Sequence, residues 1–226
     1  MTEMQAESVA REVRVWDPLV RLFHWSLVAS FTVAYFTGEE ESLVHVYAGY
    51  IVIGLVAFRL LWGFIGSRHA RFSDFLYSPR RTLDYLKSLR SGQAEHYMGH
   101  NPAGGWMIVM LLVSLALTSY TGLKVYGLEG YGPLAGAGTE LSLVAPAYAD
   151  DEEHEEHEGR EEHEGYGAGE GEGDEAAEEF WEELHEFISN FTVFLIAIHI
   201  AGVLVSSRLH GENLVRAMIT GRKTLR

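Results

Sequence analysis

The chain of 226 residues contains no cysteine. It therefore forms no disulfide, holds no iron–sulfur cluster or thiolate-bound zinc, and attaches no haem covalently through c-type linkages. Any metal centre must take its ligands from histidine, methionine, carboxylates or the backbone. The chain also has no basic stripe interleaved with aromatic residues, which argues against a nucleic-acid partner.

Basic residues are few, with 17 Lys and Arg against 32 Asp and Glu, and the formal net charge is −15. This imbalance is local, because residues 150–183 hold 18 acidic residues and one basic residue, which leaves the remaining chain at +2. Within it, residues 150–179 form an acidic, Gly-rich insert of low complexity, which we expect to be disordered outside the cytoplasm. Three interpretations of the insert stay open: a solvated spacer, a site that binds divalent metal loosely, or an acidic surface that steers a basic electron-donor protein. The histidines of the insert are His154, His157 and His163.

Four apolar segments lie at about residues 18–37, 43–65, 106–122 and 181–207. Each is close to the ~20 residues that a helix needs to cross the hydrocarbon core of a bilayer. The first segment is too long for a cleavable signal core and lacks a small-residue cleavage site. The pattern predicts an all-α fold, an integral membrane four-helix bundle that forms one domain over residues 1–226.

Lys and Arg predict the orientation, because cytoplasmic loops of membrane proteins are enriched in them. They gather in both terminal tails and after the second segment, whereas the connection after the first segment has none. We therefore expect both termini in the cytoplasm (N-in/C-in). A short amphipathic helix from about Pro79 should lie along the cytoplasmic surface; its inward side chains would be Leu83, Tyr85, Leu86 and Leu89.

Histidines occur inside three of the apolar segments. His185 and His199 share the last one, where their spacing of fourteen residues corresponds to a rise of roughly 21 Å along one helix face. In the expected orientation, His24 and His199 lie toward the cytoplasmic side, and His45 and His185 lie toward the outer side. Each of the two pairs thus joins different helices at a matching depth.

Two imidazoles that face each other across a helix bundle are typical axial ligands of haem b. The pairs His24/His199 and His45/His185 therefore predict two haem b groups, with these four histidines as ligands of the iron. A single membrane histidine is as often a helix–helix hydrogen-bond group or a proton-relay group as it is a metal ligand. The haem prediction therefore depends on the pairing of the histidines.

Other polar and small residues in the segments have ordinary structural interpretations. Gly49, Gly54 and Gly202 either clear space beside a porphyrin or mark helix contacts. Arg59 is expected to snorkel to lipid phosphate, with a haem propionate as the alternative partner. We expect interfacial tryptophans at Trp16, Trp25, Trp62 and Trp106, and solvated or headgroup histidines at His69, His96, His100 and His210.

Several stretches together resemble the prokaryotic cytochrome b561 superfamily: VWDPLVRLFHW, HVYAGYIVIGLVAFRLLWGFIGSRHARFSDF and HNPAGGWMIVMLL, followed by the two histidines of the last segment. The likeness is greatest to the branch of nickel–iron hydrogenase cytochrome b subunits, and it covers nearly the whole chain except the acidic insert. It implies a di-haem cytochrome b of the bacterial inner membrane. The ligands carried over by this resemblance are His24, His45, His185 and His199.

The resemblance also implies electron transfer between a periplasmic redox protein, either a hydrogenase or a multihaem cytochrome c, and the membrane quinone pool. The chain would then be an electron-transfer subunit, embedded in membrane lipid, rather than a stand-alone enzyme. Weak candidates for a quinone site are Arg21, Arg59 and His69. The alternatives are a metal-cation transporter with a His-rich loop and a self-contained, quinone-linked superoxide oxidase.

Overall fold

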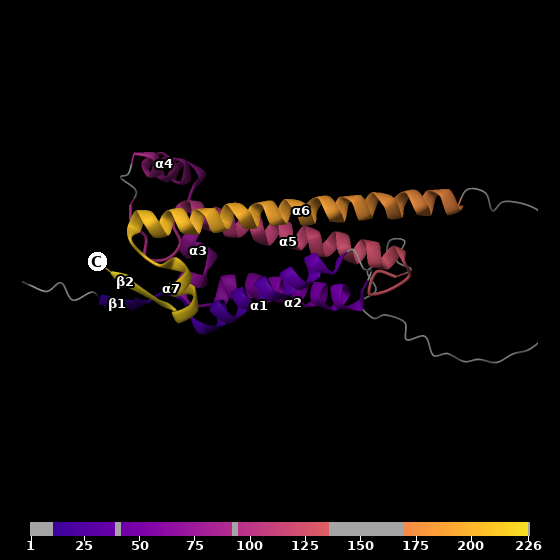
Figure 1. The fold of residues 1–226 in the computed structure, drawn as a ribbon, viewed down its shortest axis with the longest axis horizontal. Helices are drawn as coiled ribbons and strands as arrows, with labels where there is room; N and C mark the ends of the chain where they lie inside the picture. The colour runs from indigo at the N-terminus through magenta and orange to yellow at the C-terminus, as the bar shows by residue number, and fades with distance from the viewer. Residues whose placement is uncertain (1–10, 39–41, 92–94, 136–169, 226) are drawn as a thin grey trace, which may run out of the picture. The chain divides into compact units, whose positions relative to one another are not determined.

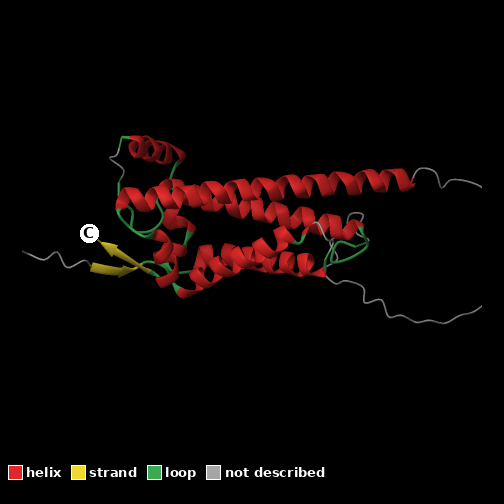
Figure 2. Cartoon of the chain, viewed as in Figure 1, coloured by secondary structure: helices red, strands yellow, loops and turns green. Residues whose placement is uncertain are grey.

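The computed structural model describes residues 11–38, 42–91, 95–135 and 170–225. The chain divides into two compact units: unit 1 comprises Met1–Ser119 and Ser189–Arg226, and unit 2 comprises Tyr120–Ile188. Helices dominate the described residues, as the red ribbons of Figure 2 show. Most of the acidic insert lies outside the described residues, including its three histidines.

Two apolar helices of unit 1, α1 (Pro18–Phe36) and α2 (Leu43–Ile65), match the first two predicted segments. Both begin at a polar cap. The Asp17 side chain accepts a hydrogen bond from the backbone N–H of Val20 at 2.8 Å, and the Ser42 hydroxyl accepts one from the N–H of His45 at 3.3 Å. These caps satisfy backbone donors that the first turn of a helix leaves without partners.

The core between the spans is small and aliphatic. Val52 and Val56 of α2 are buried against Leu115 of α5 (Pro102–Leu128), and Leu27 and Phe31 of α1 pack on them. Many large side chains point outward instead; Phe36, Phe64 and Ile65 are 76%, 74% and 74% exposed. Outward apolar side chains on helices of this length are the arrangement that lipid requires.

Among the described residues, four helices are long and apolar enough to cross a membrane, in agreement with the prediction. The last two are longer than expected. Helix α6 covers Glu170–His210, so residues 170–179, which we predicted to be part of a disordered insert, are its first turns. The correction has a physical reason: these residues are mostly Glu and Ala, which favour helix, and carboxylates at an N-terminus interact well with the helix dipole.

The segment between α2 and α5 contains the 3₁₀ turn η2 (Arg68–Ala70) and two helices, α3 (Phe72–Phe75) and α4 (Pro79–Arg90). Helix α4 starts at Pro79 as predicted, with Ser78 as its cap. Of the four side chains expected to point inward, Tyr85 is buried, whereas Leu83 and Leu86 are 57% and 46% exposed.

Unit 1 also contains a feature that we did not predict. Strands β1 (Arg11–Arg14) and β2 (Arg222–Leu225) pair in antiparallel fashion, with Arg14 opposite Arg222. They lie beside helix α7 (Leu214–Thr220), as Figure 1 shows. The pairing joins segments close to the two ends of the chain.

A small apolar cluster holds this pair to the helices. Val15 and Trp16 pack against Ala217 of α7, and all three are buried. Gly221 ends α7 with φ +80°, a left-handed conformation that favours glycine, and a side chain there would meet the carbonyl oxygen of Trp16 at 2.8 Å. Trp16, expected at the membrane interface, is therefore part of a packed core.

Candidate functional site

The first predicted pair lies within unit 1. His24 is on α1 and His199 is on α6, and the two imidazoles are near enough to interact electrostatically. Both residues are half-buried within apolar helices. The Nδ1 atom of His24 is buried and has no hydrogen-bond partner among the described residues. A buried polar atom left without a partner costs about 1–3 kcal/mol, so this site calls for a further group.

His45 lies in the first turn of α2, and its ring contacts the end of α1. Its Nδ1 atom lies 2.8 Å from the backbone carbonyl oxygen of Ala34. A carbonyl oxygen can only accept, so Nδ1 carries the proton and donates it in this hydrogen bond. The lone pair of the ring is therefore on Nε2, which is the tautomer that a metal-ligating histidine needs.

His185 belongs to unit 2, where the end of α5 and the start of α6 place it against Thr121 and Gly122. The Thr121 hydroxyl lies 2.9 Å from Nδ1 of His185, and Thr121 is 1% exposed. A Cβ atom at Gly122 would lie 3.0 Å from Cε1 of the same ring. Glycine thus allows the imidazole to lie close to α5, and threonine orients it.

The structure places His24 and His199 in the same unit, near enough to interact electrostatically. His45 and His185 belong to different units, so their pairing stays a prediction. Each of these two has a hydrogen-bond partner at Nδ1, the kind of outer contact that orients a ligating imidazole.

The residues fit the requirements of haem b. An iron with two axial imidazoles needs histidine nitrogens with a free lone pair inside the spans, and the tautomer of His45, with its lone pair on Nε2, meets that requirement. Gly49 lies one turn after His45; it is half-buried, yet a Cβ there would meet nothing within 4 Å. This unfilled space beside a histidine suits a flat macrocycle. No group of three or more His, Asp or Glu able to hold a metal ion occurs among the described residues.

Arg59 differs from the expectation that it snorkels to lipid. It is 4% exposed, and its guanidinium lies 5.3 Å from the ring centroid of Phe72 and 5.7 Å from that of Phe75. Its Nη1 atom is buried without a hydrogen-bond partner among the described residues. Burial against α3 holds it inside the protein, because those aromatic faces attract a cation.

His100 also differs from the solvated position that we expected. Its ring packs between Trp16 and Phe75, at centroid distances of 4.5 and 4.9 Å, and its Nδ1 atom is buried without a described partner. Burial, with the positive charges of Arg59 and Lys223, lowers the pKa of His100 to about 3. The ring is therefore neutral at physiological pH.

The other loop histidines have carboxylate partners. His69 lies 2.9 Å from Asp74, and His96 lies 2.6 Å from Glu212. Neither histidine shares in the membrane pairs, in agreement with their predicted loop positions. Both contacts are local, between an imidazole nitrogen and a carboxylate oxygen.

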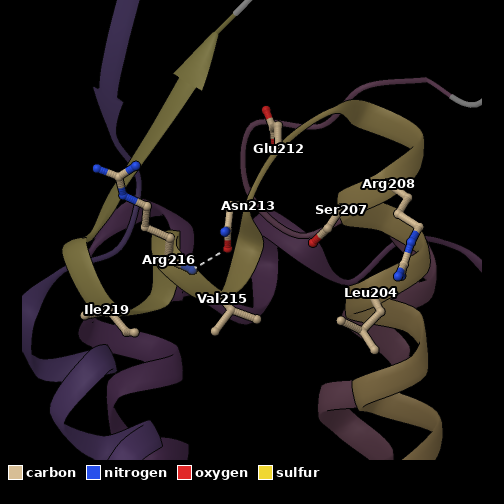
Figure 3. A pocket seen from close by; sticks show the side chains of 8 residues that line it. All are labelled: Leu204, Ser207, Arg208, Glu212, Asn213, Val215, Arg216 and Ile219. Carbon is tan, nitrogen blue, oxygen red and sulfur yellow. Dashed lines mark hydrogen bonds between the residues drawn. The ribbon is translucent and has the colours of Figure 1, made fainter.

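A groove lies where the end of α6 meets α7 (Figure 3). Apolar side chains of Leu204, Val215 and Ile219 line it together with Arg208 and Arg216. No histidine lines this groove, so it does not belong to the candidate haem ligands. Its mixture of apolar and cationic side chains is typical of a surface in the headgroup region of a membrane.

These features define a class of protein: an integral membrane protein of apolar helices that carry histidines within their spans. A family model described as "Prokaryotic cytochrome b561" matches residues 15–221. The chain belongs to this family. It is accordingly a multi-pass membrane protein and a b-type cytochrome of membrane electron transfer.

Curated relatives indicate which branch of the family the chain is similar to. A "Probable Ni/Fe-hydrogenase B-type cytochrome subunit" of Azotobacter vinelandii is 27% identical over 172 residues, which cover 62% of this chain and 70% of the relative. A protein of the same name from Rhodobacter capsulatus is 28% identical over 162 residues, 58% of this chain and 62% of the relative. The chain is thus similar to the hydrogenase branch, as predicted. No solved structure matches the chain at a comparable level of significance.

Proposed function

We propose that this chain conducts electrons across the bacterial inner membrane as a di-haem cytochrome b, between a periplasmic redox partner and the quinone pool. The observation that carries the proposal is the electrostatic interaction of His24 on α1 with His199 on α6, inside two apolar spans of a cytochrome b561 family member. A second haem is proposed for His45 and His185 on the basis of their predicted depth.

Haem b supplies one-electron redox chemistry when bound. The protein's residues position it and tune it. The Ala34 carbonyl and the Thr121 hydroxyl orient the rings of His45 and His185, and the apolar helices exclude water. A hydrogen bond from Nδ1–H makes an imidazole a stronger donor to iron, so these contacts would stabilise the oxidised metal.

The partner is proposed from the relatives, which are named as hydrogenase cytochrome subunits. A nickel–iron hydrogenase in the periplasm would exchange electrons with the outer haem, and a multihaem cytochrome c is the alternative partner. Quinone would react close to the His24/His199 side. Reduction of purified protein by hydrogenase plus hydrogen, but not by a multihaem cytochrome, would distinguish the two partners.

Two observations support the proposed location of both termini on one side of the membrane. The described residues contain four candidate spans, an even number that returns the chain to its starting side, and β1 pairs with β2. The distribution of Lys and Arg assigns that side to the cytoplasm. Reporter fusions test this: green fluorescent protein should fluoresce at either end, and alkaline phosphatase should be inactive at both.

The direct test is haem content. Protein purified in detergent should show a reduced-minus-oxidised spectrum of b type, with about two haems per chain. His199→Ala should remove one haem and leave most of the other, while the matched variant His210→Ala, at the end of the same helix, should keep both. Protein without haem, or with haem unaffected by His199→Ala, would refute the proposal.

A further inference from the structure

Two hydrogen-bonding groups that have no partner among the described residues are buried close to the same aromatic ring. Phe75 is fully buried, the Arg59 guanidinium lies 5.7 Å from its centroid, and the His100 ring lies 4.9 Å from it. The Nη1 atom of Arg59 and the Nδ1 atom of His100 have no hydrogen-bond partner among the described residues. Such a pair of buried, unsatisfied groups is costly unless a further group occupies the space next to them.

The chemistry of this missing group follows from the charges around it. The side chains that interact electrostatically with His100 are Arg59, Lys223, His199 and His69, all of them basic. A buried guanidinium is stable when an anion pairs with it, and a carboxylate matches its planar donors best. The group must therefore be an anion that accepts hydrogen bonds.

The carboxylates of Asp17 and Glu212 are already engaged by other groups. Asp17 interacts with Arg59 over a longer distance, but its carboxylate accepts hydrogen bonds from the Val20 N–H at 2.8 Å and from the side chains of Ser67 and Trp62. Glu212 lies 3.3 Å from Lys223 and 2.6 Å from His96. Among the described residues, neither carboxylate forms a direct ion pair with Arg59.

The proposed cofactor carries carboxylates of its own, on its two propionates. His199 interacts electrostatically with both His100 and His24, which links the surroundings of His100 to the predicted pair of iron ligands. We propose that Arg59, supported by His100, binds a propionate carboxylate of the haem held by His24 and His199. This inference rests on the proposed function, since it requires a haem at that pair.

The contact would set the redox potential as well as the position of the cofactor. An unneutralised carboxylate near iron stabilises the ferric state, which carries one more positive charge than the ferrous state. A buried guanidinium cancels that effect and raises the midpoint potential. Arg59 is thus a positioning residue, which acts on the iron through the propionate.

The test compares Arg59→Gln with Arg68→Gln, because Arg68 lies in the following loop and its side chain is 85% exposed. Potentiometric titration of purified Arg59→Gln should show a lower midpoint potential than wild type for one of the two haems. Arg68→Gln should show the same midpoint potentials as wild type. Arg59→Lys keeps the charge and should shift less. In a His199→Ala background, Arg59→Gln should leave the remaining haem unchanged.

A second measurement works even where the potentials are hard to resolve. Apoprotein is loaded with protohaem or with its dimethyl ester, and the rate of haem transfer to apomyoglobin is measured for each. The wild type and Arg68→Gln should release the ester several-fold faster than protohaem, whereas Arg59→Gln should lose most of this difference. Arg59→Lys, the milder substitution, should lie between them if Arg59→Gln does not assemble.

The outcomes separate the two proposals. Haem-free wild-type protein would refute the proposed function, and the propionate contact with it. Normal haem content with unchanged potentials and unchanged ester discrimination in Arg59→Gln would refute the contact alone. If inorganic phosphate or anionic lipid, added to the apoprotein, protects Arg59 but not Arg68 from phenylglyoxal while haem does not, the anion site is a phosphate site and the propionate assignment is wrong.

Discussion

The Nδ1 atom of His45 lies 2.8 Å from the carbonyl oxygen of Ala34, which joins the start of α2 to the last turns of α1. Because the carbonyl fixes the tautomer, Nε2 is the atom that would bind the iron of the proposed haem. His45→Ala should therefore lower the haem content from about two to about one per chain, measured as the pyridine haemochrome. His96→Ala, a loop histidine paired with Glu212, is the control and should keep both haems.

Thr121 should control the redox potential of the haem proposed at His185. Its hydroxyl lies 2.9 Å from Nδ1 of that ring. Loss of an outer hydrogen bond to a metal ligand typically costs about 10–100-fold in affinity, and it weakens the imidazole as a donor. Thr121→Val should raise one midpoint potential in a redox titration and speed loss of one haem. Thr118→Val, one turn earlier, should do neither; equal effects of both variants would argue against the role.

Gly49 and Gly54 give a steric test on one helix. A Cβ atom at either position meets nothing within 4 Å, but Gly49 is half-buried and follows His45 by one turn, whereas Gly54 is exposed. If a porphyrin covers Gly49, then Gly49→Leu should abolish binding of one haem, while Gly54→Leu should be tolerated at the lipid surface. Normal haem spectra in both variants would show that Gly49 faces lipid as well.

The sequence was sufficient for the spans because apolar length and capping are local signals. Helix α2 begins and ends at the predicted residues, and Pro79 marks the start of α4. The extent of α6 was underestimated, because composition alone does not show how far a stable helix extends into an acidic, Ala-containing stretch. The β1–β2 pairing was not predicted, since it joins two short charged segments from opposite ends of the chain.

The same distinction applies to the site. The intramembrane histidines are conspicuous, because a polar side chain in lipid needs a partner. The roles of Arg59 and His100 depend on tertiary contacts with Phe75, a residue distant from both in the sequence, and no periodic pattern reveals such contacts. One local signal for the position of His100 did exist, because it precedes Asn101. The Asn101 side chain accepts a hydrogen bond from the Gly104 N–H at 2.7 Å, which places His100 directly before the first turn of α5.

Asp17 provides a pH-dependent test of how α1 is anchored. Burial raises the pKa of Asp17, but hydrogen bonds from the Ser67 side chain, the Val20 and Leu19 N–H groups and Trp62 outweigh this, and the pKa is below its usual value of 3.8. Folding therefore lowers this pKa. The ionised carboxylate consequently stabilises the folded protein at pH values above the pKa that Asp17 has in the unfolded chain. That stability is lost as the pH falls through the folded value.

Asp17→Ala removes the cap of α1 and should cost about 0.5–2 kcal/mol at neutral pH, the usual range for such a cap. Asp17→Asn keeps an oxygen acceptor for the Val20 N–H but cannot ionise, so it should lose less. Thermal unfolding in detergent, followed by circular dichroism from pH 7 to pH 3, measures both variants. The gap between wild type and Asp17→Asn should narrow as the pH falls below the usual carboxyl pKa of 3.8 toward the lower folded value. A gap that stays constant would mean that the charge of Asp17 adds nothing to its role as a cap.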